Sequence, residues 1–277
     1  MPEIFDLHCH STASDGALTP DALLRRAGEK GVTSLALTDH DSTAGLAAAR
    51  QTADAIGIDL IPGIEISTTW NNKCFHIIGL NIDANYPPLL EGMRELRVTR
   101  NRRAEKIAAK LEKAGIPNVL PAVLEQAGEG MITRTHFAAF LLRENHVSTL
   151  QEAFDRYLGK GKPAFAATTW VELAQAVDWI NASGGVAVIA HPLRYKITAS
   201  WLKRFFKAFR EAGGQGIEVV CRRSNTDEIH LIGNYARQYE FYGSVGSDFH
   251  TPENPWVELG RLAPLPKGVR PVWELFG

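Results

Sequence analysis

Short β-rich runs alternate with helical patterns along most of this chain, and this alternation restricts its fold more than any other feature. Seven strand-like runs recur: IFDLH, SLALTDH, DLIPGIEIS, KCFHIIGL, GVAVIAH, GIEVV and FYGSVGSD. Helical patterns are found near residues 20–30, 43–56, 170–183, 200–212 and 226–239. Alternating strands and helices form parallel sheets. Seven such units joined by right-handed crossovers favour a sheet that curves until its first and last strands meet. The pattern therefore predicts an α/β fold with a closed or nearly closed parallel barrel.

The alternation breaks between residues 87 and 167, where the sequence is helical and charged. We therefore predict a barrel made of residues 1–86 and 168–277, with residues 87–167 inserted as a helical lid over the substrate. The insertion contains the basic run RVTRNRR at residues 97–103. This run is typical of a helix face exposed to solvent. The alternative is that its arginines form a basic rim that faces the phosphate of a substrate.

Composition limits the classes of partner. The chain has 30 Lys and Arg against 31 Asp and Glu, so net charge gives no reason to expect binding to duplex DNA. We expect no membrane-spanning segment and no exported form, and the sequence indicates no obligate protein partner. Cys9, Cys74 and Cys221 are odd in number and far apart, which favours buried reduced thiols and a cytoplasmic protein.

Histidines gather at the strand-like runs. Six of the nine lie inside such a run or just past its end: His8, His10, His40, His76, His191 and His250. Four carboxylates have matching positions: Asp15, Asp39, Glu65 and Asp248. Since the carboxyl ends of parallel strands meet on one face of a barrel, we expect these side chains to converge despite their separation in sequence.

Any one of these histidines could be structural, but the set favours a metal centre. His8 and His10 alternate along a strand, so their side chains share one face. Glu65 in an apolar strand would bury a costly charge unless it were paired or bound to metal. Imidazole and carboxylate ligands with no Cys-x-x-Cys pair indicate a catalytic site for divalent cations. Clustered cations clamp the attacking and leaving oxygens in phosphoryl transfer, so phosphoester hydrolysis is the expected chemistry.

An ordered set of motifs resembles a known family. DLHCHSTASDGALTP, LTDHDS, PGIEIS, HIIGL, AHP and GSDFH follow one another from Asp6 to His250 and resemble the polymerase and histidinol phosphatase (PHP) domain phosphoesterases. In the insertion, ITRTHFAAFL and FDRYLGKGKPAF resemble a subgroup that acts on nucleotides. That subgroup includes nucleoside 3′,5′-bisphosphate phosphatases and exonucleases that shorten RNA from the 5′ end.

The resemblance implies a distorted (β/α)7 barrel of the TIM type with two or three divalent metal ions, manganese first and zinc, iron or magnesium as alternatives. By correspondence with the family motifs, the first ion would be held by His8, His10, Glu65 and Asp248. Glu65 would bridge to a second ion completed by His76 and His191, and a third ion would lie among Asp15, His40 and His250.

Basic residues near the expected site are candidates for phosphate contact, each with a structural alternative. Arg134 and His136 stand at the start of an expected helix, where anions bind readily, and the resemblance favours a substrate role for both. Lys160 and Lys162 lie in the glycine-rich GKGKPAF loop. Three arginines follow strands and complete the set: Arg194, Arg222 and Arg223.

We expect a metal-activated hydroxide to release the 3′-phosphate of a nucleoside 3′,5′-bisphosphate such as adenosine 3′,5′-bisphosphate. Asp248, His191 and His250 are the expected catalytic residues, with one of the two histidines protonating the leaving oxygen. A 5′–3′ exoribonuclease acting on short 5′-phosphorylated RNA is the main alternative. A non-catalytic metal-binding regulatory domain and a metal-dependent amidohydrolase are alternatives of other classes.

Overall fold

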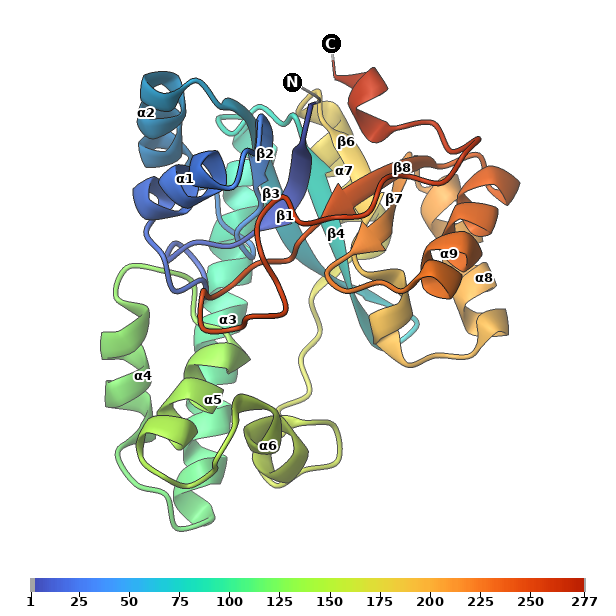
Figure 1. Cartoon of the computed structure of the whole chain (residues 1–277). Helices are drawn as coiled ribbons and strands as arrows, with labels where there is room; N and C mark the ends of the chain where they lie inside the picture. The colour runs from blue at the N-terminus through green and yellow to red at the C-terminus, as the bar shows by residue number, and fades with distance from the viewer. Residues whose placement is uncertain (1–2, 277) are drawn as a thin grey trace.

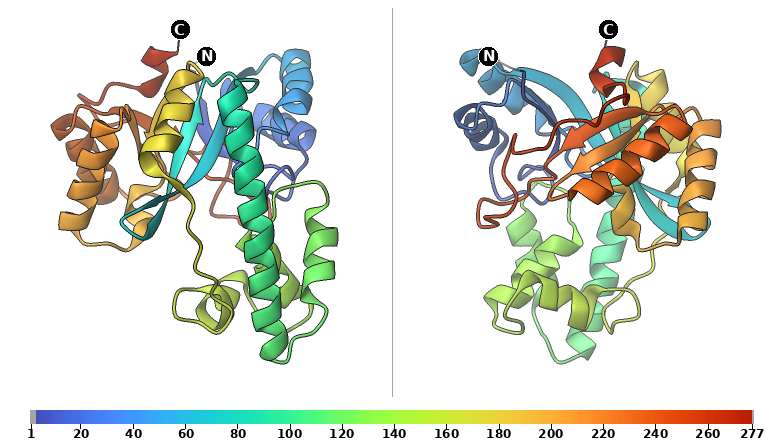
Figure 2. Two further views of the ribbon diagram at one scale, coloured as in Figure 1. Left: turned by 180° about the vertical axis from the view of Figure 1, so that it is seen from behind. Right: turned by 45° about the vertical axis from the view of Figure 1, so that its right-hand side comes forward.

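The computed structural model describes residues 3–276, in which a strongly curved sheet is surrounded by helices (Figures 1 and 2). The sheet has the order β1-β2-β3-β4-β6-β7-β8, and the two-residue β5 pairs with β3. The strands are β1 (Phe5–Cys9), β2 (Ser34–Leu37), β3 (Asp59–Trp70), β4 (Lys73–Leu80), β5 (Val171–Glu172), β6 (Val186–Ile189), β7 (Gly216–Cys221) and β8 (Tyr242–Gly246).

The two outer strands of this order approach each other. The backbone N–H of His10 donates to the carbonyl of Phe249 at 2.9 Å, and the N–H of Asp248 donates to the carbonyl of His8 at 2.7 Å. These bonds join the end of β1 to the segment that follows β8 and nearly close the sheet. The predicted seven-stranded α/β barrel is thereby confirmed.

β4 departs from the prediction. It runs antiparallel to both β3 and β6, so the expectation of a wholly parallel sheet is wrong at this strand. Asn71 and Asn72 join β3 to β4 with φ angles of 47° and 57°. Consecutive positive φ angles are those of a type I′ hairpin turn. Because so short a turn leaves no room for a crossover, β4 must return antiparallel to β3.

Five helices flank the barrel within about three residues of their expected bounds. They are α1 (Pro20–Glu29), α2 (Leu46–Ile56), α7 (Leu173–Ala182), α8 (Ala199–Glu211) and α9 (Thr226–Gln238). Figure 1 shows α1 and α2 on one side of the sheet and α8 and α9 on the other. From α8, Phe205 stacks on Phe75 of β4 with ring centroids 3.8 Å apart, so aromatic contacts fix this helix on the sheet.

The segment between residues 87 and 167 is described throughout and contains helices but no strand. Its elements are α3 (Pro87–Lys113), α4 (Val119–Ala127), α5 (Arg134–Arg143), α6 (Leu150–Ala153) and a π-helical turn (Phe154–Leu158). Phe137 and Leu141 belong to an apolar cluster formed within residues 104–166, whereas Leu89 and Leu96 of α3 belong to the barrel core. Figures 1 and 2 show the helices together beyond the carboxyl end of β1. The domain division and the role as a lid stay predictions.

The proline-rich tail packs back onto the barrel. Pro271 pairs with Gly243 of β8, and Trp273 stacks on Phe5 of β1 with ring centroids 4.1 Å apart. Val272, at the start of a short 3-10 turn (Val272–Leu275), is buried among the barrel strands. The tail thus covers apolar surface that the helices leave open.

The three cysteines are free thiols, but their burial differs from the prediction. Cys9 is buried and Cys221 is half-buried, whereas Cys74 of β4 is exposed. The expectation of three buried thiols is therefore wrong at Cys74, whose side chain lines a cavity between the barrel and the insertion. Among residues 3–276, no helix combines the length and apolar character needed to cross a bilayer.

Candidate metal centre

The buried carboxylate of Glu65 lies at the centre of the site. β3 carries it into a ring of five imidazoles: His8, His10, His40, His76 and His191. Its Oε1 lies 2.9 Å from Nδ1 of His76 and 3.0 Å from Nε2 of His191. Its Oε2 lies 2.8 Å from Nδ1 of His40. Each oxygen therefore faces imidazole nitrogens, from β4 and from the segments that follow β2 and β6, which is the arrangement a bridging carboxylate needs.

His8 of β1 and His10, just past the end of this strand, point toward the same cluster, as their spacing predicts. Both are buried, and their Nε2 atoms lie 3.1 Å apart. Nδ1 of His8 donates to Glu218 Oε1 at 2.8 Å, which fixes the ring and leaves Nε2 toward the cluster. Glu218 also accepts from the backbone N–H of His191. Sequence reasoning missed Glu218, although a carboxylate within the apolar run GIEVV was the same signal that singled out Glu65.

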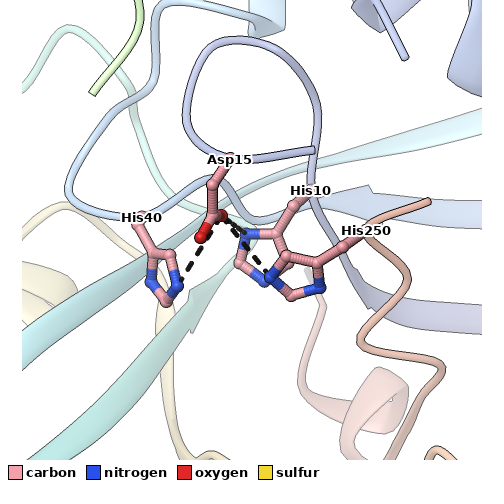
Figure 3. Close-up of side chains that lie close together, drawn as sticks. All are labelled: His10, Asp15, His40 and His250. Atoms are coloured by element: carbon pink, nitrogen blue, oxygen red, sulfur yellow. Dashed lines mark ion pairs between the residues drawn. The ribbon is translucent and has the colours of Figure 1, made fainter. Parts of the chain in front are cut away.

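A second gathering of donors lies beside the first (Figure 3). Asp15 Oδ1 lies 3.4 Å from Nε2 of His250, 3.9 Å from Nε2 of His40 and 4.0 Å from Nδ1 of His10. Asp15 Oδ2 accepts a hydrogen bond from the hydroxyl of Thr133 at 2.8 Å. Thr133 precedes α5, so the insertion touches this part of the cluster directly.

Asp248 joins the imidazoles to two arginines. Its Oδ1 lies 3.4 Å from Nε2 of His10 and 3.7 Å from Nε2 of His8. Its Oδ2 accepts from Arg194 and lies 3.0 Å from Nε of Arg222. Asp248 has a φ of 49°, a conformation that costs energy for a residue with a side chain and that is concentrated at functional sites.

Asp39 has a different position from the other predicted carboxylates. It accepts hydrogen bonds from Ser11 and Ser14, including one from the Ser14 hydroxyl at 2.6 Å. Asp39 thus holds the loop between β1 and α1, which in turn places Asp15. Its role is to position the loop that carries a cluster member.

Burial sets the protonation of several members. It lowers the pKa of His10 to about 3, with a further contribution from His250, and it lowers the pKa of His191. A neutral imidazole is the form that binds a cation. Burial opposes ionisation of Glu65, but the charges of His40 and His76 outweigh it and hold the pKa of that carboxyl well below its usual range. Burial thus favours the neutral form of His10 and His191. Glu65 raises the pKa of His76 to about 10 and Glu218 raises the pKa of His8, in both cases against the effect of burial.

Several buried polar atoms of the cluster make no hydrogen bond among residues 3–276: Asp15 Oδ1, Glu65 Oε2, His40 Nδ1 and His191 Nδ1. Glu65 Oε2 and His40 Nδ1 face each other at 2.8 Å, but without the geometry of a hydrogen bond. An unsatisfied buried polar atom costs about 1–3 kcal/mol, and more when it is charged. Three sets of donors in the described chain each have ligand atoms within 4.8 Å of one another: His8, His10 and Glu65; His40, Glu65 and His76; and His10, Asp15, His40 and His250. Such nitrogen and carboxylate sets fit divalent cations, whose binding would satisfy the unpartnered atoms.

A cavity of about 150 Å³ opens beside the cluster. Asp15, His40 and His76 line one part of it, and Cys74 lies next to them. Three arginines of the insertion also line it: Arg100, Arg103 and Arg134. Guanidinium groups bind phosphate oxygens in a bidentate manner, so a cavity with this lining favours an anionic ligand next to the metal ligands.

The interpretation of residues 97–103 as a solvated helix face is wrong at Arg100 and Arg103. Arg100 is 4% exposed and donates to Asp41 Oδ2 at 2.7 Å and to Ser67 Oγ at 3.0 Å. Burial, followed by the charges of Arg134 and Arg100, lowers the pKa of Arg103 to about 9. Its Nε is buried with no partner among the described residues. The alternative of a basic rim therefore fits these two arginines.

The other predicted substrate residues have varied positions. Arg134 lines the cavity, whereas His136 is buried and its Nδ1 accepts from the backbone N–H of Thr133 at 3.1 Å, which caps α5. Lys160 and Lys162 are exposed and are not among the residues that line the cavity. Arg194 binds Asp248. Substrate roles for all of these residues stay predictions.

Comparison with known proteins identifies the family. A sequence model of the PHP domain matches residues 6–212, which is more than half of the chain. The chain belongs to the PHP domain family. A 5′-3′ exoribonuclease of Haemophilus influenzae is 44% identical over 100% of both chains. The 5′-3′ exoribonuclease Rnm of Escherichia coli is 46% identical over 99% of this chain and 94% of its own.

Other PHP relatives differ in their named activity. A 3′,5′-nucleoside bisphosphate phosphatase of Chromobacterium violaceum is 41% identical over 97% of this chain and 95% of its own. Among solved structures, an amidohydrolase from Chromobacterium violaceum with bound sulfate and no metal has a TM-score of 0.93 at 41% identity, covering 98% of this chain and 95% of that one. The resemblance to PHP phosphoesterases is thus confirmed over nearly the whole chain.

Proposed function

We propose that this PHP domain is a metal-dependent phosphoesterase that removes the 3′-phosphate from nucleoside 3′,5′-bisphosphates such as adenosine 3′,5′-bisphosphate. One observation carries the proposal: the same cavity is lined by members of the metal cluster and by Arg100, Arg103 and Arg134. A substrate with two phosphates can place one at the cluster and the other at the arginines. The named activity of the Chromobacterium violaceum relative supports this assignment.

Two or three divalent ions would be held by the cluster residues in the combinations expected from the sequence. His8, His10, Glu65 and Asp248 would hold the first, Glu65 with His76 and His191 the second, and Asp15, His40 and His250 the third. When bound, such cations polarise phosphoryl oxygens and lower the pKa of water. Manganese as the ion loaded in the cell is a finer proposal, which elemental analysis of protein purified without added metal tests.

The chain's own residues would orient the reaction. Arg103 and Arg134 would hold the 5′-phosphate, and Thr133 positions Asp15 through its hydroxyl. Water attacks phosphorus, the bond between phosphorus and O3′ breaks, and O3′ takes a proton. His250 is the group proposed to supply that proton when no third ion occupies it, since Asp15 faces it and raises its pKa against the effect of burial, whereas burial lowers the pKa of His191.

A 5′–3′ exoribonuclease activity is the second candidate, favoured by the relatives that are 44% and 46% identical. The first nucleotide of a 5′-phosphorylated RNA also has a 5′-phosphate and a phosphorus on its 3′ oxygen. Hydrolysis between that phosphorus and O3′ would release a nucleoside 5′-monophosphate. The two substrates thus present the same unit to the same cavity and differ only in the group attached beyond the scissile phosphorus.

The test compares substrates on manganese-loaded protein. We expect phosphate release from adenosine 3′,5′-bisphosphate. Release from adenosine 3′-monophosphate should be much slower, because this nucleotide lacks the 5′-phosphate that the arginines would bind. A 5′-phosphorylated pentaribonucleotide, followed by chromatography of its mononucleotide products, measures the second activity. Absence of phosphate release from the bisphosphate would overturn the first assignment, and absence of mononucleotide release would overturn the second.

A further inference from the structure

An exposed tryptophan stands in the segment that leaves the metal centre. Trp256 is 61% exposed, the largest value among the large apolar side chains of residues 3–276. The guanidinium carbon of Arg223, from the loop after β7, lies 4.6 Å from the centroid of its ring. A single exposed apolar residue is ordinary on a protein surface, but one paired with a stacked arginine offers an aromatic face together with a positive charge.

The backbone around this tryptophan is fixed. Its N–H donates to Asn254 Oδ1 at 3.2 Å, and Arg261 donates to the carbonyl of Pro255 at 3.1 Å. The next residue, Val257, is buried in the apolar cluster beneath α1 and α2. The ring is therefore presented to solvent by an anchored turn, so little conformational entropy opposes its use as a contact surface.

Trp256 and Arg223 are connected to the metal centre by their neighbours in sequence. Arg222, beside Arg223, lies 3.0 Å from Asp248 and donates to its carbonyl at 3.3 Å. The segment that bears Trp256 begins directly after His250. In Figures 1 and 2 this segment, coloured orange to red, extends from β8 toward the helices of the insertion. Neither Trp256 nor Arg223 lines the cavity that holds the three arginines.

We propose that Trp256 and Arg223 form a stacking platform for the nucleotide that follows the scissile phosphate in an RNA substrate. The inferred platform rests on the proposed phosphoesterase function and adds a subsite that a bisphosphate cannot use. Bases of single-stranded RNA stack on aromatic side chains with little regard to sequence, and arginine adds attraction to the backbone. Arg194 and Arg222, 49% and 30% exposed in their side chains, supply further positive charge beside Asp248.

The experiment compares two substrates in matched variants of the full chain. In Trp256→Ala we expect kcat/KM for a 5′-phosphorylated pentaribonucleotide to fall about tenfold, mainly through KM, as expected for loss of one stacked base. Turnover of adenosine 3′,5′-bisphosphate should not change. Trp256→Phe should retain most of the wild-type kcat/KM for the pentaribonucleotide, because phenylalanine keeps an aromatic face. Arg223→Ala should lower this kcat/KM by less than Trp256→Ala does. Leu231→Ala, at a 43% exposed residue of α9, is the control for removing exposed apolar surface.

A binding measurement separates this proposal from the proposed activity. A pentaribonucleotide with a 3′-terminal fluorophore and a phosphorothioate at its first linkage is titrated with each variant, and anisotropy gives the Kd without turnover. We expect Trp256→Ala to raise this Kd about tenfold even if neither substrate is hydrolysed. An unchanged Kd, or equal losses of kcat/KM on the bisphosphate and the pentaribonucleotide, would overturn the platform.

Discussion

The barrel and the helical insertion contribute to the site in different ways. The barrel supplies the metal-type donors from the ends of strands that are distributed between His8 and His250. The insertion supplies cations from neighbouring helices, with Arg100 and Arg103 on α3 and Arg134 at the start of α5. The fold of the barrel fixes the positions of the metal-type donors. The positions of the arginines depend on how the insertion packs against the barrel. If the proposed function holds, the barrel would supply the chemistry and the insertion would contribute to substrate choice.

The largest effect should come from the centre of the barrel. Glu65→Gln should lower kcat/KM for adenosine 3′,5′-bisphosphate by roughly a thousandfold, since the charge that gathers the cations is lost. Metal content measured by elemental analysis should fall in parallel, while far-UV circular dichroism stays that of the wild type. Asp248→Asn should behave similarly. Glu240→Gln, at an exposed carboxylate paired with Arg210, is the matched control. If Glu65→Gln hydrolysed the bisphosphate at the wild-type rate, the metal cluster of the barrel could not be the site of the reaction.

The seating of the insertion should depend on one buried ion pair. Arg100, 4% exposed, donates to the fully buried Asp41 from 59 residues away. Arg100→Ala should lower the free energy of unfolding by about 3–5 kcal/mol, because it leaves the Asp41 carboxylate buried without a counter-charge. Urea denaturation measures this loss.

The same helix offers a control for the ion pair. Arg94 pairs with Glu91 on the outside of α3, where the two side chains are 72% and 62% exposed. Arg94→Ala should leave the urea midpoint unchanged, because exposed pairs contribute little. Equal stability losses in the two variants would show that Arg100 acts only as a helix residue and does not join the insertion to the barrel.

The barrel was the more predictable of the two regions. Strand-end histidines could be assigned because the carboxyl ends of parallel strands converge whatever their separation in sequence. The direction of β4 was missed, although the Asn71 and Asn72 turn that reverses the chain is local and was present in the sequence. Glu218 was missed although, like Glu65, it is a carboxylate within an apolar strand; its contact with His8 spans 210 residues and is not contained in the local pattern.

The insertion could be predicted only as helical. A run of arginines on a helix does not show which side is buried, because burial of Arg100 depends on Asp41 and Ser67 in the barrel. Local periodicity does not contain such distant contacts. His136 was selected for its place at a helix start, and the structure gives that place a capping role. Sequence thus singled out Arg134, which lines the cavity, but did not identify Arg100 and Arg103, which line it too.

The role of the insertion in substrate choice can be sharpened with Arg103→Ala. Loss of a charged hydrogen bond to phosphate costs about 1.5–3 kcal/mol, so kcat/KM for adenosine 3′,5′-bisphosphate should fall roughly 10- to 100-fold, chiefly through KM. Adenosine 3′-monophosphate, which has no 5′-phosphate, should be hydrolysed as by the wild type. Arg102→Ala, at the exposed neighbour on the same helix, is the control. Equal losses on both nucleotides would assign Arg103 to the scissile phosphate instead.

The smallest effect concerns the close packing of α3 on the barrel, where two opposing contributions can be compared. Alanine normally stabilises a helix relative to glycine by about 1 kcal/mol. At Gly92, however, an added Cβ would lie 2.3 Å from the ring of Trp179 on α7, so Gly92→Ala should lower the free energy of unfolding by about 1–3 kcal/mol. At Gly28 on α1 the nearest atoms would be 3.5 Å away, and Gly28→Ala should be neutral or stabilising. Urea denaturation of both variants measures the difference, and a stabilised Gly92→Ala would mean that α3 is free to move away from the barrel.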